Sequence, residues 1–235
     1  MYGQTNQVTL DQARQEASSI FLAKVFNWMA VGLGLTGVVA YLTAATGITY
    51  ALVQSPLFYV LIFGELGLVI YLSARVQKLQ ASTATALFVA YAALNGITMS
   101  IIFLRYTSTS IAGTFFITAG MFGAMALYGL ITKRDLSGFG SFLMMGLVGI
   151  IIAMIVNFFL ASSVLHMAIS AIGVFIFTGL TAFDVQRIKQ IGEAGILEQG
   201  GDVVKKGAIM GALTLYLDFI NLFWMLLQFF GGSND

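Results

Sequence analysis

The chain has 235 residues and a net charge of +1, yet only 9% of its residues are charged and 59% are hydrophobic. A soluble domain carries about 25% charged residues, so this composition excludes an ordinary water-soluble protein and indicates an all-α integral membrane protein. The near-neutral charge implies no nucleic-acid partner. The lack of cysteine excludes disulfides and thiolate metal sites.

The chain begins with a polar segment of 19 residues that carries Asp11 and Glu16. This segment lacks a basic stretch followed directly by an apolar run, so we do not expect a cleaved signal peptide. We predict a polar tail over residues 1–19, a membrane domain over 20–231 and a short C-terminal end over 232–235.

Seven apolar runs follow the tail, and each is long enough to cross a bilayer as a helix. At the second run, Ser55 and Pro56 are typical of a helix start, since serine caps the first turn and proline fits into it. The longest predicted connection, residues 188–206, is expected to be mobile and solvated. The predicted helices cover residues 25–45, 57–74, 84–104, 111–131, 141–161, 167–187 and 208–230.

The positive charges predict the orientation of these helices. Ten of the eleven Lys and Arg residues lie in the tail or in the connections after the second, fourth and sixth runs, and only Arg105 lies on the other side. Basic residues accumulate on the cytoplasmic side of membrane proteins. We therefore expect a cytoplasmic N-terminus and a C-terminus outside.

Three acidic residues lie within apolar runs: Glu65, Asp184 and Asp218. An ionisable side chain inside a membrane is costly, and it usually faces the bundle interior or marks a functional site. The basic residues nearest to them, Arg75 and Arg187, lie at helix ends, from which their side chains can reach the interface. The three acids are therefore the candidate site residues.

Small and polar residues share the face of Asp218 on the last helix, because residues three, four and seven apart lie on one side. Thr214 and Asn221 lie on this face, and Gly207 and Gly211 form a GxxxG pattern suited to close helix contact. On the sixth helix, Asp184 shares its face with Ser170, Gly173, Phe177, Thr181 and Arg187.

Residue spacing leaves the relative depth of Asp184 and Asp218 open. They become level if the sixth helix continues through Ile191 or the seventh starts nearer Gly211. A level pair would titrate as a unit and share a proton, bind Ca²⁺ through its oxygens, or be neutralised by Arg75 or Arg187. The alternative is that each acid bonds a nearby polar group and only holds helices together, and for Glu65 no second acid is an obvious partner.

Two stretches, FDVQRIK at 183–189 and LTLYLDFINLFWMLLQFFG at 213–231, resemble the Bax inhibitor family of seven-helix membrane proteins. Residues 91–107 and 118–140 are also similar to it. The family usually has Tyr before the first acid, where this chain has Phe183. The resemblance covers about residues 20–231 and is closest to bacterial inner-membrane members.

The resemblance implies a fold in which six helices surround a central seventh helix. It implies that Asp184 and Asp218 form the pH-responsive site of a Ca²⁺ leak, with Glu65 and Arg75 as looser matches. The ligands expected are then Ca²⁺ and protons, without a resident cofactor. Another bacterial relative modulates a membrane-anchored AAA protease, so a non-transporting regulator of such a partner is the alternative function.

An enzyme is not expected. Intramembrane aspartyl proteases of the presenilin type carry GxGD, whereas here Leu215, Tyr216 and Leu217 precede Asp218. A His-rich zinc hydrolase is excluded because the chain has a single histidine, His166.

Overall fold

The computed structural model describes the backbone of residues 2–232 and the side chains of residues 12–232, and it contains no strand in this part of the chain. Seven helical segments are long and apolar enough to cross a membrane, which confirms the predicted class and number of spans. The elements are α1 (Tyr2–Ala45), α2 (Ile48–Val53), α3 (Leu57–Arg75), η1 (Val76–Lys78), α4 (Ala81–Met99), α5 (Ile102–Arg105), α6 (Ser108–Ile131), α7 (Ser137–Leu160), α8 (Ser163–Glu193), η2 (Ile196–Glu198) and α9 (Gly201–Phe230).

The expected long connection over residues 188–206 is wrong. Helix α8 continues to Glu193 and α9 begins at Gly201, so only a short link with the 3₁₀ turn η2 joins them. This link turns at Gly195 and Gly200, which have φ angles of +82° and +91°. Glycine adopts this conformation readily because it has no Cβ. The glycines that made the segment look flexible therefore form a compact turn.

The third span is interrupted near its end, which the apolar pattern did not predict. Helix α4 ends at Met99, and α5 begins at Ile102. The Ser100 hydroxyl donates to the Ile97 carbonyl at 2.6 Å and accepts from the Thr49 hydroxyl at 2.8 Å. A serine side chain that bonds the backbone in this way competes with the regular helical pattern.

Proline and serine start α3 as expected. The Ser55 hydroxyl accepts a hydrogen bond from the Leu57 amide at 3.2 Å, but Pro56 rather than Ser55 is the N-cap residue, and α3 begins after it at Leu57. The tail predicted over residues 1–19 has no break before the first span, because α1 is continuous from Tyr2 to Ala45.

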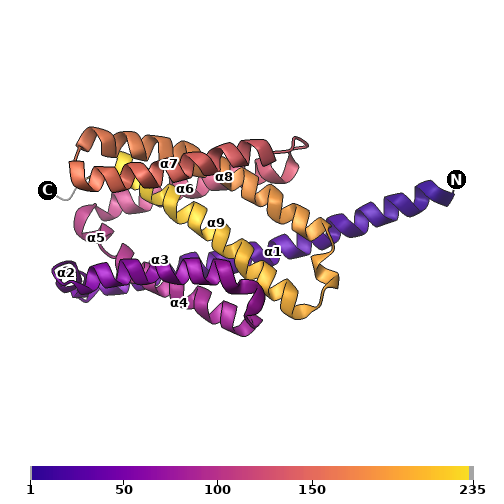
Figure 1. Ribbon diagram of the computed structural model, residues 1–235, viewed down its shortest axis with the longest axis horizontal. Coiled ribbons are helices and arrows are strands. Elements are labelled where there is room, and N and C mark those ends of the chain that lie inside the picture. The colour runs from indigo at the N-terminus through magenta and orange to yellow at the C-terminus, as the bar shows by residue number, and fades with distance from the viewer. Residues whose placement is uncertain (1, 233–235) are drawn as a thin grey trace. The chain divides into compact units, whose positions relative to one another are not determined.

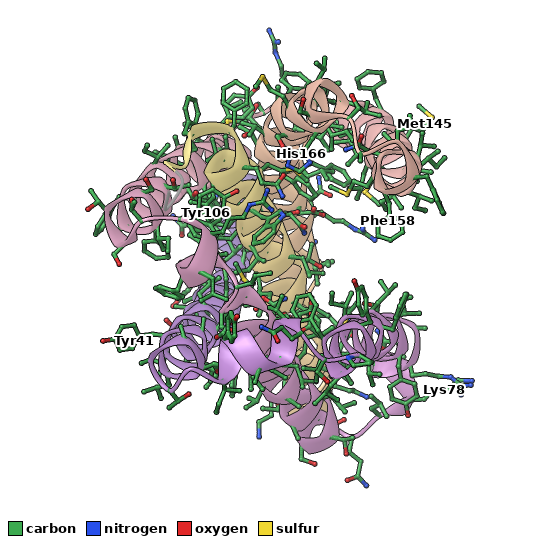
Figure 2. The ribbon with its side chains drawn as sticks, turned by 90° about the vertical axis from the view of Figure 1, so that its left-hand side faces the viewer. Tyr41, Lys78, Tyr106, Met145, Phe158 and His166 are labelled. Carbon is green, nitrogen blue, oxygen red and sulfur yellow. The ribbon has the colours of Figure 1, made fainter. Side chains whose placement is uncertain are left out.

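The chain divides into two compact units. Unit 1 contains the chain up to Leu104 together with Ile188–Tyr216, and unit 2 contains Arg105–Arg187 together with the chain from Leu217. In unit 1, helix α4 packs against α1 and α3 (Figure 1). Apolar side chains of unit 1 such as Tyr41 project away from their helix, as expected for a surface that faces lipid (Figure 2).

Unit 2 is built around α8, which lies alongside α6 and α7 (Figure 1). Met145 of α7 points outward (Figure 2), and α7 is mostly exposed, with 11% of its span buried. The final helix α9 has 61% of its span buried, the highest share of the seven. The buried apolar cluster of unit 2 comprises Leu143, Ile150, Ile169, Ile176, Phe177, Leu180, Leu222, Met225 and Leu226.

Candidate functional site

Asp184 of α8 and Asp218 of α9 lie together in unit 2, within hydrogen-bonding reach of each other. Only 8% of Asp184 and 5% of Asp218 is exposed. Two carboxyl groups can hydrogen-bond only when one of them carries a proton, since an ionised carboxylate is an acceptor alone. The geometry of the pair would therefore allow the two acids to share one proton.

Helix α8 continues past its predicted end, and the two acids lie side by side. Asp184 lies nine residues before the end of α8, whereas the predicted helix ended three residues after it. This is the first of the two arrangements in which the sequence allowed the acids to be level. Helix α9 also begins earlier than predicted, at Gly201, so residue counting alone does not explain the pairing.

One oxygen of the pair has no partner. Asp218 Oδ2 is buried and makes no hydrogen bond with a described residue. A buried polar atom of this kind costs about 1–3 kcal/mol when it stays unsatisfied. The unpaired oxygen is thus available to a proton, a water molecule or a cation.

Arg187 is the basic residue closest in sequence to the pair. It lies three residues after Asp184, one turn along α8, and interacts electrostatically with that carboxyl group. Arg75 belongs to unit 1, where its side chain is exposed and forms no salt bridge with a described residue.

The predicted polar face of α9 is occupied mainly by bonds to its own backbone. The Thr214 hydroxyl donates to the Met210 carbonyl at 3.1 Å, and the Asn221 amide donates to the Leu217 carbonyl at 2.8 Å. Gly207 and Gly211 face Phe21 and Val25 of α1 within unit 1. The GxxxG pattern therefore serves close packing against α1, as small residues do in membrane helices.

Close helix packing surrounds Asp184. A Cβ on Gly129 of α6 would collide with the backbone oxygen of Ala182, and a Cβ on Gly140 of α7 would collide with the ring of Phe183. Both glycines therefore let neighbouring helices approach the turn of α8 that carries the acid. The sequence did not single out either glycine.

Gln186 of α8 is a further residue near Asp184 that the sequence did not single out. Its amide nitrogen donates to the Arg134 carbonyl at 2.9 Å, and its amide oxygen accepts from the Leu136 amide at 2.9 Å. The side chain thus ties the link between α6 and α7 to α8, two residues after Asp184. Its position inside the FDVQRIK stretch, which resembles a family motif, is the sequence feature that could have pointed to it.

Glu65 lies apart from the aspartates, in unit 1, as the absence of an obvious second acid suggested. Its carboxylate accepts from the Thr98 hydroxyl at 2.8 Å and also hydrogen-bonds with the side chain of Asn95. Tyr216 donates to the oxygen of the same asparagine at 3.0 Å. Nothing in the local sequence around Glu65 points to these partners.

A metal ion would find few protein ligands here. The described residues contain no group of three or more His, Cys, Asp or Glu side chains that could hold one. Ca²⁺ prefers 6–8 oxygen ligands, so the aspartate pair would need water and carbonyl oxygens to complete a shell.

Residues 18–235 match the family described as inhibitor of apoptosis-promoting Bax1. The chain is similar to the inner membrane protein YbhL of Escherichia coli K12, with 53% identity over 214 residues that cover 90% of this chain and 91% of the relative. An uncharacterized protein of Borreliella burgdorferi is 46% identical over 97% of this chain and 99% of its own length. One from Deinococcus radiodurans is 44% identical over 98% and 96%.

Proposed function

Because the chain belongs to the Bax inhibitor family, we propose that it is a pH-sensitive Ca²⁺ leak in which a proton shared by Asp184 and Asp218 controls the pathway. The observation that carries this proposal is the buried contact between the two carboxyl groups. No other two acids of the described residues are both buried and in contact.

The mechanism follows from the charge of the pair. With one proton, the acids hydrogen-bond and hold α8 and α9 together. When the last proton leaves, two negative charges face each other at short range, and repulsion favours either separation of the helices or binding of a cation between them. Packed helices have discrete arrangements, so a small local change can become a two-state transition.

A flux measurement in liposomes tests this function. Purified protein is reconstituted with a Ca²⁺ dye inside, and entry is followed over a pH series for the wild type, Asp184→Asn and Asp218→Asn. Asparagine keeps the size of aspartate but cannot titrate, so we expect both variants to lose the pH dependence of the leak. Glu193→Gln is the matched control on α8, because Glu193 pairs with Lys189 at 3.8 Å near the helix end.

Flux that follows the wild-type pH profile in both aspartate variants would rule out the shared proton as the controlling element. Absence of flux at every pH in the wild type would instead favour the alternative, a regulator of a membrane-anchored protease. We place the protein in the inner membrane, as the name of the Escherichia coli relative says of that protein.

The regulator has its own test. The first span begins at Gln12, while α1 begins at Tyr2, so residues 2–11 can be deleted without removing a residue of the span. The deletion must stop before Ser18, whose hydroxyl donates to the Lys189 carbonyl at 3.1 Å. Loss of co-purification with an AAA protease, with unchanged flux, would show two separable roles.

A further inference from the structure

A buried chain of hydrogen bonds crosses unit 1 and ends at an acid. Glu65 of α3 bonds the side chain of Asn95 on α4, and the oxygen of Asn95 lies 3.0 Å from the hydroxyl of Tyr216 on α9. That hydroxyl lies 2.7 Å from the hydroxyl of Thr36 on α1, and Thr36 in turn lies 2.9 Å from the Ala92 carbonyl oxygen. Residues from four helices thus form one chain of hydrogen bonds.

The side chains in the middle of this hydrogen-bond chain are closed to solvent. Tyr216 is fully buried, Thr36 is 3% exposed and Asn95 is 9% exposed. The Tyr216 ring is fixed by edge-to-face contacts with Phe88 and Tyr91, with ring centroids 6.0 Å and 5.8 Å apart. Each buried hydroxyl must therefore find its partner within the chain.

The number of hydroxyl protons limits the directions in which the hydrogen bonds of this series can point. Thr36 and Tyr216 have one hydroxyl proton each. If Thr36 donates to Ala92 and Tyr216 donates to Asn95, the 2.7 Å contact between the two hydroxyls contains no proton. One bond must reverse, and the amide of Asn95 allows this because its oxygen and nitrogen exchange places by a half-turn of the side chain.

The ionisation of Glu65 selects between the two directions. An ionised Glu65 accepts from the amide nitrogen of Asn95, so the amide oxygen accepts from Tyr216, and Tyr216 accepts from Thr36. A protonated Glu65 donates to the amide oxygen instead. The amide nitrogen then donates to Tyr216, Tyr216 donates to Thr36, and Thr36 donates to Ala92, so that all four contacts contain a proton.

We propose that Glu65 is a second proton-binding site, and that its protonation reverses the hydrogen bonds running through Asn95 and Tyr216 to Thr36. The same heavy-atom positions serve both directions, so the switch needs no movement of a helix. Binding of the proton at Glu65 is independent of the aspartate pair and of any cation flux.

The described part of unit 1 contains no ion pair for Glu65. The ionisable groups with which it interacts electrostatically are Tyr91 of α4 and Tyr216 of α9. Free phenols have a pKa of about 10, and neither tyrosine can replace Glu65 as the group that gains or loses a proton near neutral pH.

Infrared difference spectroscopy across pH steps tests the proposal on the full chain in lipid vesicles. The background is the double variant Asp184→Asn and Asp218→Asn, which removes the signals of the pair, and tyrosine is isotope-labelled. We expect a carboxylic-acid band and a tyrosine band to change over the same pH range. Glu65→Gln should lose the tyrosine band and the part of the carboxylic-acid band that comes from Glu65, since glutamine donates permanently as a protonated acid would.

Two further variants distinguish proton binding at Glu65 from the response of the hydrogen bonds beyond it. Asn95→Leu should keep the carboxylic-acid band and lose the tyrosine band. Tyr216→Phe should also remove the tyrosine band, whereas Tyr41→Phe, at an exposed position, should leave it unchanged. If Glu65→Gln fails to fold, Glu65→Asp serves instead, because its shorter side chain keeps the acid band but draws away from Asn95.

The proposal is overturned by a tyrosine band that persists in Glu65→Gln or Asn95→Leu, or by a carboxylic-acid band that is the same in Glu65→Gln as in the background. It is also overturned if the background protein shows no carboxylic-acid band over the pH range in which it stays helical. A negative flux result for the aspartate pair leaves these spectra unaffected, so the two proposals can fail separately.

Discussion

Asp135 shows how one exposed acid supports a helix from outside the membrane. It lies in the link between α6 and α7, and its carboxylate accepts from the Ser137 amide at 2.9 Å at the start of α7. The hydrogen bonds from Ser137 hold the pKa of Asp135 below its usual range. A negative charge is also favourable at a helix N-terminus.

The depressed pKa of Asp135 gives a prediction with a defined sign. Its contribution to stability is complete above the ordinary carboxyl pKa and is lost as pH falls through the lower pKa of the folded state. We expect Asp135→Ala to lower the thermal unfolding temperature at pH 7 and to approach the wild type in acid. Asp135→Asn keeps the acceptor and should fall between them, and an equal loss at both pH values would contradict this account.

At the scale of an element, α8 is positioned by contacts on two sides of Asp184. The backbone at Ala182 rests against Gly129 of α6, and the side chain of Gln186 bonds the link before α7. Both contacts lie within one turn of the acid. The position of the Asp184 carboxyl group therefore depends on residues that never touch it.

Gln186→Ala should destabilise the protein by about 1–3 kcal/mol, because it leaves the Leu136 amide and the Arg134 carbonyl without their partner. The measurement is thermal or denaturant unfolding in detergent. Gln190→Ala, four residues later on the exposed side of α8, is the matched control and should be nearly neutral. Equal effects of the two substitutions would show that the amide bonds carry no net stability.

Gly129→Ala should cost about 1–3 kcal/mol, the usual cost of overpacking, because the added methyl meets the Ala182 backbone. Gly123→Ala on the same helix has open space at its Cβ position. It should be neutral or stabilising, since alanine favours helix by about 1 kcal/mol over glycine. A neutral Gly129→Ala would mean that α6 and α8 are not in tight contact at this point.

At the scale of the whole molecule, charge rather than packing sets the orientation in the membrane. Ten of the eleven basic residues are predicted on one side, and the cytoplasmic side retains such residues. We expect a fluorescent protein fused to the C-terminus to stay dark in bacteria, because it is exported unfolded, and one at the N-terminus to fluoresce. Bright C-terminal fusions would contradict the proposed orientation.

The membrane class, the seven spans and the family could all be predicted from the sequence. A bilayer forces each spanning segment to satisfy its own backbone hydrogen bonds, so the length and polarity of each run already define a helix. Asp184 and Asp218 were identifiable for the same reason, as charges inside apolar runs. These are local properties, and local sequence is sufficient to determine them.

Only the tertiary structure decided which of these residues meet. Asp184 meets Asp218 where α8 and α9 pack together, and Glu65 reaches Asn95, which bonds Tyr216 from 121 residues away in sequence. Such contacts depend on how helices pack, and helical periodicity shows a polar face without showing what it faces. The sequence thus determined the helices and their acids, while packing determined the pair and the chain of hydrogen bonds.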